Sequence, residues 1–273
     1  MRTGVKQLLL IAGGAILVVA LYLAPQKIIK TESEKENHLH ENEISFDGLN
    51  AEAKGQLKRQ ELDNISILET ALKKDPSSTD LNDSIGKMWD RLGHPQISSH
   101  YYQQVAEKDQ SEKSWINAAY RYYDASRMTS DSLMRSFFIE KAISSYQNVL
   151  KINPDNLDAK TDLGLCYAEG PAPMQGILLL REVVEKNPKH EMAQYNLGIL
   201  SVKSGQYDKA VGRFEKVLVI NPGNAEARFL LARTFASMGK KELALKNLEM
   251  IKSSKDSRLN EQVIILINQI NNN

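Results

Sequence analysis

The residues of this sequence that could do chemistry are few and far apart. Cys166 is the single cysteine, so it forms no intramolecular disulfide and offers no second thiolate for a metal. His38 and His40 lie close together, but the segment HEN at 40–42 lacks the second histidine of the zinc-binding motif H-E-x-x-H. Catalysis would need a nucleophile beside an oriented base, or paired carboxylates in a pocket. No spacing indicates either, so we expect a protein that is not an enzyme and that binds no cofactor or metal.

Gly198 and Gly205 offer a second chemical possibility, in the segment YNLGILSVKSGQYDKA at 195–210. Glycines can cradle a phosphate, and they can also let two helices touch. A phosphate-binding loop has the pattern G-x-G-x-x-G or G-x-x-x-x-G-K-[ST] after a strand, and the sequence contains neither. We therefore expect a contact between helices, in which Gly198 and Ala210 lack bulk where the helices approach and Phe214 fills the space beside them.

Helical periodicity runs from about residue 56 onward. Apolar residues recur at steps of three and four, as at Ile65, Leu68 and Leu72. No window alternates as a strand would, which predicts an all-α fold. Several helical stretches end at an Asp-Pro or Asn-Pro pair, because the residue before a proline is pushed out of the helical region.

These prolines belong to a repeat of 34 residues, since Pro154, Pro188 and Pro222 are each 34 residues apart. Small and large side chains keep the same register. The equivalent positions are Leu163, Leu197 and Leu231; Gly164, Gly198 and Ala232; Gly205 and Gly239; Gly176, Ala210 and Ala244; and Leu180, Phe214 and Leu248. A fixed period of this length in paired helices resembles the tetratricopeptide repeat.

The resemblance is clearest in three consecutive units, 157–190, 191–224 and 225–258. The middle unit carries nearly the whole family pattern. It departs from the pattern at Gln194 and Ser201, where the family usually has tryptophan and tyrosine. The resemblance does not include the apolar segment near the start of the chain.

Degenerate units up to residue 154 precede the clear ones, so the repeat domain is predicted to span 56–258. In one degenerate unit, Trp115 and Ala142 are 11 residues further apart than in the family pattern. This surplus is about three helical turns and predicts a lengthened helix pair. The segment RMTSDS at 127–132 is the expected turn between the two helices, because its Ser, Thr and Asp residues can cap the second one.

Residues 259–273 are expected to form a helix that caps the last repeat. Val263 and Ile267 belong to its apolar stripe. Ile264 and Ile265 fall partly outside that stripe. We expect them to be ordinary core residues, with a contact to a second subunit or to a partner as the alternative.

The resemblance implies a right-handed superhelical solenoid of helix pairs, whose concave face is lined by the first helix of each pair. Proteins of this family bind peptides or helices of other proteins in that groove. The family's groove positions fall on Asp158, Thr161, Leu165, Glu169, Met192, Tyr195, Ile199, Val202, Glu226, Phe229 and Arg233. The apolar members of this set predict a strip for an amphipathic partner helix, or they simply pack against neighbouring repeats.

Two functions without catalysis remain open. The first is an adaptor that recruits a peptide or protein to a membrane, as do family members that assist cytochrome assembly or accompany secretion machinery. The second is a permanent structural subunit of a membrane-associated complex. A net charge of +1, with a quarter of the residues charged, argues against a nucleic-acid partner. The protein partner is not identified by the sequence, and homo-oligomerisation is open but not indicated.

The start of the chain differs from the rest. Residues 8–24, LLLIAGGAILVVALYLA, carry no charge and as a helix span roughly 25 Å, the short end of what a bilayer core requires. They predict a single transmembrane helix within an anchor at 1–30. A cleavable signal peptide is the alternative, but the stretch is long and Tyr22 occupies a position before Ala24 that prefers a small side chain.

The charges around the predicted anchor indicate its orientation. The amino terminus with Arg2 and Lys6 slightly outweighs Lys27 and Lys30, which favours a cytoplasmic N-terminus. The repeat domain is then expected on the outer side of the cell membrane, in the periplasm if the source is bacterial. The polar residues 31–55 are expected to form a linker, flexible or partly helical, between the anchor and the repeats.

Overall fold

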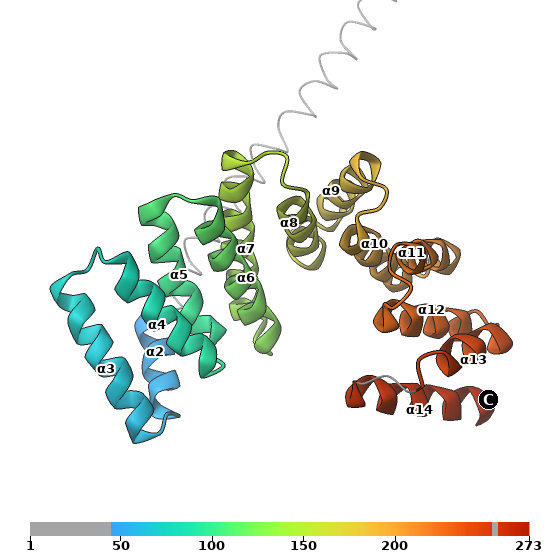
Figure 1. Cartoon of the computed structure of the whole chain (residues 1–273), viewed down its shortest axis with the longest axis horizontal. Coiled ribbons are helices and arrows are strands. Elements are labelled where there is room, and N and C mark those ends of the chain that lie inside the picture. Colours follow the sequence, from blue (N-terminus) through green and yellow to red (C-terminus); the bar gives the residue numbers. More distant parts are fainter. Residues whose placement is uncertain (1–44, 253–255, 273) are drawn as a thin grey trace, which may run out of the picture. The chain divides into compact units, whose positions relative to one another are not determined.

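The computed structural model describes residues 45–252 and 256–272, and every regular element in them is an α-helix (Figure 1). The chain divides into two compact units, Met1–Leu57 and Lys58–Asn273. The described part of the first unit contains α2 (Phe46–Gly55), which is capped by the side chain of Ser45. This helix lies within the stretch predicted to be a polar linker.

The predicted membrane anchor at 8–24 lies outside the described residues, as do His38 and His40. Among the helices that the structure does describe, none is long and apolar enough to cross a bilayer.

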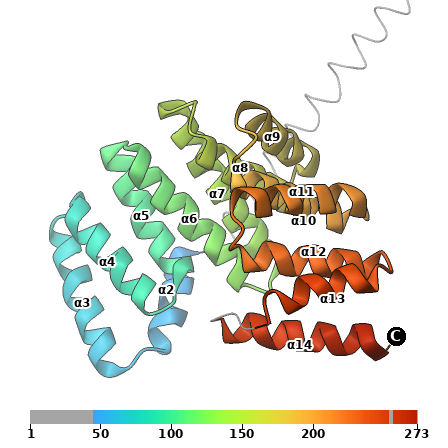
Figure 2. The ribbon, with the colours of Figure 1, turned by 45° about the vertical axis from the view of Figure 1, so that its right-hand side comes forward.

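The second unit is a succession of antiparallel helix pairs, each packed on the next (Figures 1 and 2). The pairs are α4 with α5, α6 with α7, α8 with α9, α10 with α11, and α12 with α13. The helix bounds are α3 (Arg59–Lys74), α4 (Thr79–Arg91), α5 (Pro95–Asp109), α6 (Glu112–Met128), α7 (Ser132–Ile152), α8 (Leu157–Glu169), α9 (Pro173–Lys186), α10 (Glu191–Lys203), α11 (Tyr207–Ile220), α12 (Ala225–Ser237), α13 (Lys241–Glu249) and α14 (Ser257–Asn272).

The helix ends follow the predicted repeat. α7, α9 and α11 each end two residues before one of the repeated prolines. Within the pairs, Gly205 and Gly239 have φ angles of 71° and 73°, in the left-handed region that favours glycine. The same two positions, 34 residues apart, therefore turn the chain from the first helix of a pair into the second.

Gly198 lies at a contact between paired helices, as predicted, and Gly164 and Gly176 lie at the equivalent kind of contact in the preceding pair. A Cβ atom added at Gly198 of α10 would lie 2.6 Å from Cε1 of Phe214 on α11. In the preceding pair, a Cβ atom at Gly176 of α9 would run into the carbonyl oxygen of Gly164 on α8. Gly198 thus lies against the ring of its partner helix, while backbone approaches backbone at Gly176, and in both cases a larger side chain would force the two helices apart.

The pair α6–α7 is the lengthened one. α6 has 17 residues and α7 has 21, against 13 and 14 in the α10–α11 pair. The turn between them lies where it was predicted, and Oδ1 of Asp131 accepts hydrogen bonds from the amides of Leu133 and Met134.

α14 covers the last pair, with Leu259, Val263 and Ile270 buried in a cluster that includes Phe235 and Leu248 of α12 and α13. The expectation that its two neighbouring isoleucines are core residues is wrong. Their exposed fractions are 52% for Ile264 and 48% for Ile265. Three buried positions already fill the face of α14 that meets α12 and α13, so these two side chains lie beside that face rather than within it.

The packing at Gly198 predicts opposite effects for two substitutions of helical glycines. Gly198→Ala should lower the free energy of unfolding by about 1–3 kcal/mol, because the new methyl group overpacks against the buried Phe214 ring. Gly212→Ala in α11 should raise it by about 0.5–1 kcal/mol, because a Cβ atom there meets nothing within 4 Å and alanine favours the helix. Urea unfolding followed by circular dichroism measures both, and equal stabilities of the two variants would contradict the packing described.

Candidate functional site

The first helices α8, α10 and α12 all begin with the same kind of cap. The side chains of Asn156, His190 and Asn224 accept hydrogen bonds from the amides three residues further on. Each of these residues lies two positions after a repeated proline, and they are 34 residues apart. The equivalent turn of these three repeats thus satisfies an amide that would otherwise lack a partner at the helix start.

Each capping side chain also bonds a carboxylate at the start of the preceding first helix. Asn224 donates from Nδ2 to Oε1 of Glu191 at 2.8 Å, and Asn156 donates to Oε1 of Glu112 at 2.6 Å. In the intermediate repeat, Nε2 of His190 lies 3.1 Å from Oδ1 of Asp158. The hydrogen-bond network assigns the proton of this ring to Nε2, since Nδ1 accepts from the amide of Ala193. We call these three contacts the cap–carboxylate ties.

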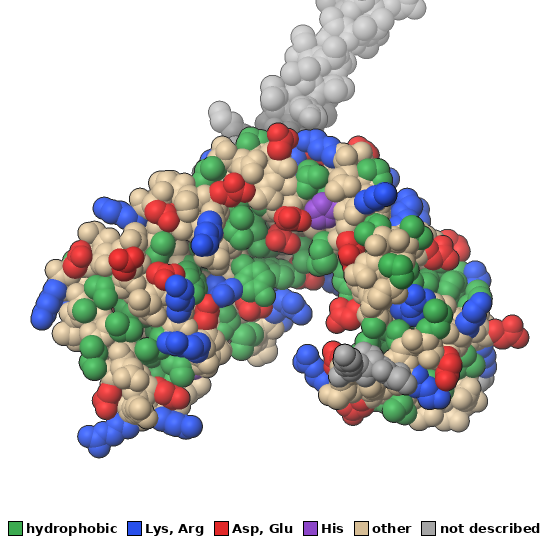
Figure 3. All heavy atoms as spheres, viewed as in Figure 1, with side chains coloured by type: hydrophobic (Ala, Val, Ile, Leu, Met, Phe, Trp, Pro, Cys, Tyr) green, Lys and Arg blue, Asp and Glu red, His purple; other side chains and the backbone are tan. Residues whose placement is uncertain are grey.

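The ties hold neighbouring first helices together at their N-terminal ends, and α10 contacts both α8 and α12 directly. Figure 3, viewed as in Figure 1, shows the unit Lys58–Asn273 hollowed on the side of α8, α10 and α12. The surface of these three helices is the one on which the sequence places the groove positions.

Four of the predicted groove residues form one apolar row along α10, namely Met192, Tyr195, Ile199 and Val202. Met192 is 52% exposed, and the other three are half-buried. The half-buried members pack against the core cluster of α11, α12 and α13, with the rings of Tyr195 and Phe214 edge to face at 6.2 Å. The α10 apolar row therefore packs against the next repeat with one side and leaves the other side accessible.

Two predicted groove residues lie in the interior instead. Thr161 is 1% exposed, and its hydroxyl donates to the carbonyl of Leu157 at 2.8 Å. Phe229 is 9% exposed and belongs to the same core cluster as Phe214. At these two positions the side chain packs within and between repeats. This is the alternative considered above, in which groove positions pack against neighbouring repeats instead of facing a partner.

The remaining predicted residues border the row. Leu165 is half-buried, and Asp158, Glu169 and Arg233 are exposed. The hydroxyl of Tyr195 donates to Glu226 at 3.1 Å, which joins α10 to α12. Burial, and then the Glu226 carboxylate, raise the pKa of Tyr195 to about 12, so the hydroxyl stays protonated and remains a donor.

Two partners of Glu169 were not predicted from the sequence. The hydroxyl of Tyr123 on α6 donates to its Oε2 at 2.8 Å, and Nζ of Lys203 on α10 lies 3.4 Å from its Oε1. Glu169 and Lys203 occupy equivalent repeat positions 34 residues apart. Opposite charges at equivalent repeat positions could therefore have predicted the ion pair between Glu169 and Lys203.

Cys166 lies beneath this surface, and its surroundings keep it unreactive. It is buried, and burial together with the Asp162 carboxylate raises the pKa of its thiol, which disfavours the nucleophilic thiolate. Asp162 in turn accepts a hydrogen bond from the Tyr146 hydroxyl at 3.2 Å. Over residues 45–252 and 256–272, no cluster of His, Cys, Asp or Glu side chains could hold a metal ion.

Comparison with known proteins agrees with this architecture. Residues 201–260 match the family model described as tetratricopeptide repeat. Anaphase-promoting complex subunit 3 of Schizosaccharomyces pombe is 24% identical over 154 residues, which are 55% of this chain and 23% of that protein. The chain thus spans about a quarter of the length of that relative.

Two solved structures share the fold. A tetratricopeptide repeat protein from Parabacteroides merdae has a TM-score of 0.57 at 19% identity, over 81% of this chain and 86% of that one. PilW, a type IV pilus biogenesis factor, has a TM-score of 0.54 at 17% identity, over 72% of this chain and 87% of that one. At these identities the likeness concerns the fold alone.

The half-buried carboxyl group of Asp162 predicts a dependence of stability on pH. Burial raises its pKa from 3.8 to about 6 in the folded chain, so the folded chain holds this proton more tightly than the unfolded chain. Its contribution to stability is therefore greatest below pH 4 and is lost as the pH rises through 6. Asp162→Asn should raise the free energy of unfolding at pH 7.5 by about 1–3 kcal/mol.

At pH 4 the same variant should differ much less from the wild type, because the folded chain then holds Asp162 neutral and much of the unfolded chain is protonated as well. The asparagine keeps an oxygen that can accept the hydrogen bond from Tyr146. Urea titrations at the two pH values measure the difference. A variant that is less stable at pH 7.5, or whose effect is the same at both pH values, would contradict the raised pKa.

Proposed function

We propose that this tetratricopeptide-repeat protein is a protein-interaction adaptor that binds a peptide or helix of a partner on the surface of α8, α10 and α12. Proteins with these repeats are generally protein-interaction adaptors, and the fold is typically a non-enzymatic scaffold. The observation that carries the proposal is the α10 apolar row, whose exposed Met192 and half-buried neighbours line one face of a first helix.

The spacing of the row indicates the form of the partner. Met192, Tyr195, Ile199 and Val202 follow one another at steps of three and four residues, so they make a straight apolar strip along α10. An amphipathic helix presents its own anchors at the same steps and can lie along such a strip. The exposed Asp158 and Arg233 on the flanking helices would orient it through charge.

We further propose that residues 8–24 anchor the adaptor in the cell membrane. In this proposal the N-terminus is cytoplasmic, and the repeats lie on the outer side, in the periplasm of a bacterium. The support is the uncharged apolar sequence and the flanking charges. Anchoring raises the local concentration of the binding surface near membrane partners, so that weak binding suffices for assembly, secretion or folding at the membrane.

A different observation favours a second candidate function, that of a permanent subunit in a membrane-associated complex. Ile264 and Ile265 are about half exposed on α14, the last described helix, and Ile264 lines a cleft with Leu245 of α13. A permanent partner would bury such a face, because interfaces of lasting complexes resemble a protein core.

Site-specific photo-crosslinking in native membranes tests the adaptor. A photoreactive residue at Tyr195 should give a discrete adduct with one partner, and a matched probe at Val219 should give none, because Val219 is 83% exposed on α11 away from the row. The additional change Met192→Glu should weaken the Tyr195 adduct about tenfold by placing a charge on the strip. Because Met192 is exposed, this variant should keep the stability of the parent.

Absence of an adduct at Tyr195, or an adduct that Met192→Glu leaves unchanged, would overturn the binding surface proposed for α10. A probe at Ile265 that captures a stoichiometric partner while Tyr195 captures none would favour the permanent subunit.

A further inference from the structure

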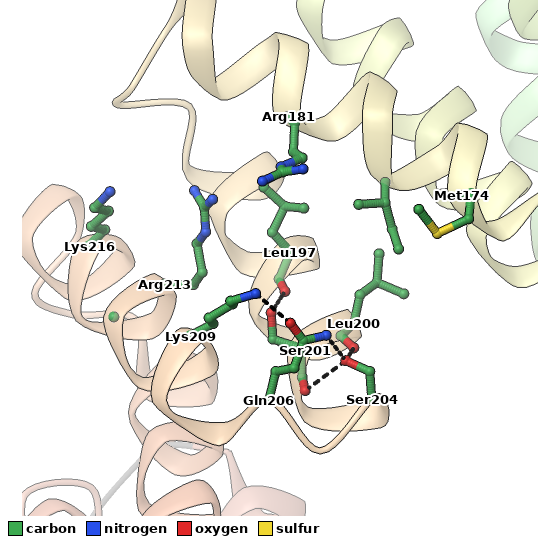
Figure 4. Close-up of a pocket in the computed structure, with 12 residues that line it drawn as sticks. Met174, Arg181, Leu197, Leu200, Ser201, Ser204, Gln206, Lys209, Arg213 and Lys216 are labelled. Atoms are coloured by element: carbon green, nitrogen blue, oxygen red, sulfur yellow. Dashed lines mark hydrogen bonds between the residues drawn. The ribbon is translucent and has the colours of Figure 1, made fainter.

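A cleft of about 440 Å³ lies between α9 and α11, with α10 as its floor (Figure 4). Its apolar part comes from Ile177 of α9 with Leu197 and Leu200 of α10. In Figure 4, Met174 lies toward one end of the cleft and Lys216 toward the other. Its volume is within the range of sites that hold a small ligand or a few residues of a peptide.

The cleft is separate from the α10 apolar row, although α10 contributes to both. Successive residues of a helix are rotated by about 100°. Leu197 and Leu200 are consequently on the side of α10 roughly opposite to Tyr195 and Val202. α10 thus carries two apolar faces, and only one of them belongs to the surface that we propose for the partner helix.

Four basic side chains surround the apolar floor: Arg181, Lys209, Arg213 and Lys216. Within the described part of the chain, none of the four forms an ion pair with a carboxylate. Arg213 donates to Oε1 of Gln194 at 2.6 Å, and Lys209 donates to Oε1 of Gln206 at 2.6 Å, so the hydrogen-bond partners of these two side chains are neutral amides.

Basic residues nearby are treated differently. Lys160 and Lys186 both pair with Glu182, at 2.6 Å and 3.7 Å. Around the cleft, in contrast, positive charges face one another, and burial with the charge of Arg181 lowers the pKa of Arg213. The cleft therefore combines an apolar floor with uncompensated positive charge, which an acidic ligand would relieve.

Gly212 supplies a second and independent observation. It lies inside α11 and lines the cleft, yet a Cβ atom added there meets nothing within 4 Å. The helical glycines Gly164, Gly176 and Gly198 each make a close contact with the paired helix. A glycine inside a helix costs about 0.5–1 kcal/mol of stability, and one established use of glycine is the close approach of a ligand to the backbone.

We propose that this cleft binds an acidic peptide segment of a partner protein, with one apolar side chain on the Ile177–Leu200 floor and carboxylates paired with the surrounding Arg and Lys residues. The open wall at Gly212 admits the backbone of that peptide. We favour a peptide over an anionic membrane because the apolar floor is recessed between two helices, where a side chain reaches and a lipid surface does not. Carboxylates match the guanidinium groups of Arg181 and Arg213 in charge and in geometry.

Selection of peptides on the full chain tests this inference. A phage-displayed library of random peptides is panned on the wild type and on the double variant Arg181→Glu/Lys216→Glu, which leaves the Arg213–Gln194 hydrogen bond in place. The control is Lys240→Glu/Lys241→Glu, which makes the same change in charge on exposed lysines at the start of α13. We expect peptides with Asp or Glu on both sides of an apolar residue to be enriched on the wild type and the control and lost on the variant.

A steric variant makes the test independent of charge. Gly212→Phe fills the cleft where a Cβ atom meets open space, so the fold should be preserved. Fluorescence anisotropy with a selected acidic peptide should show Kd at least about tenfold weaker for Gly212→Phe and for the charge variant. Met192→Glu should leave this Kd unchanged, so that failure of the cleft and failure of the α10 row are told apart.

Three results would overturn the inference. The first is a selection in which no acidic sequence is enriched. The second is an acidic peptide that binds equally well to Gly212→Phe and to the charge variant. The third is that phosphatidylserine vesicles bind in a way that depends on Arg181 and Lys216, while no acidic peptide binds. That result would assign the cleft to a membrane surface.

Discussion

The cap–carboxylate tie is the interaction on which the arrangement of the repeats depends. The side chain of Asn224 accepts from an amide at the start of α12 and donates to Glu191 at the start of α10. One side chain thereby caps the start of α12 and fixes α12 to α10, the first helix of the preceding repeat. In a repeat protein each repeat contacts only its neighbours. The spacing of the first helices is therefore set by such local contacts.

This spacing leaves α10 with two apolar faces, each of them accessible in part. One face carries the apolar row from Met192 to Val202, and the other supplies the floor of the cleft with Leu197 and Leu200. Within the pair, contact at Gly198 brings α11 close enough for its basic residues to line that cleft. In our proposals, this single helix held between two neighbours contributes to two binding surfaces of different chemistry.

Much of the fold could be predicted because its signals are local. Proline ends a helix because it restricts its own backbone, and glycine allows a turn because its own backbone is free. The 34-residue repeat therefore predicted the positions of the helix ends and of the turns. The binding surface was predictable only in part. Burial of Thr161 and Phe229 depends on how neighbouring helices pack, and a family position does not report it. The basic cleft was not predicted, because Arg181 and Lys216 come from non-equivalent positions of two helices and meet only in the folded chain.

Hydrogen exchange of Glu191→Ala, followed by mass spectrometry, tests the role of the ties most directly. Glu191 accepts hydrogen bonds from both Asn221 and Asn224, so the variant removes one tie and leaves the others. We expect faster exchange in α10 to α13 with unchanged exchange in α4 and α5. Equal acceleration throughout the described helices, or no change at all, would contradict a stack held together by ties between neighbouring repeats.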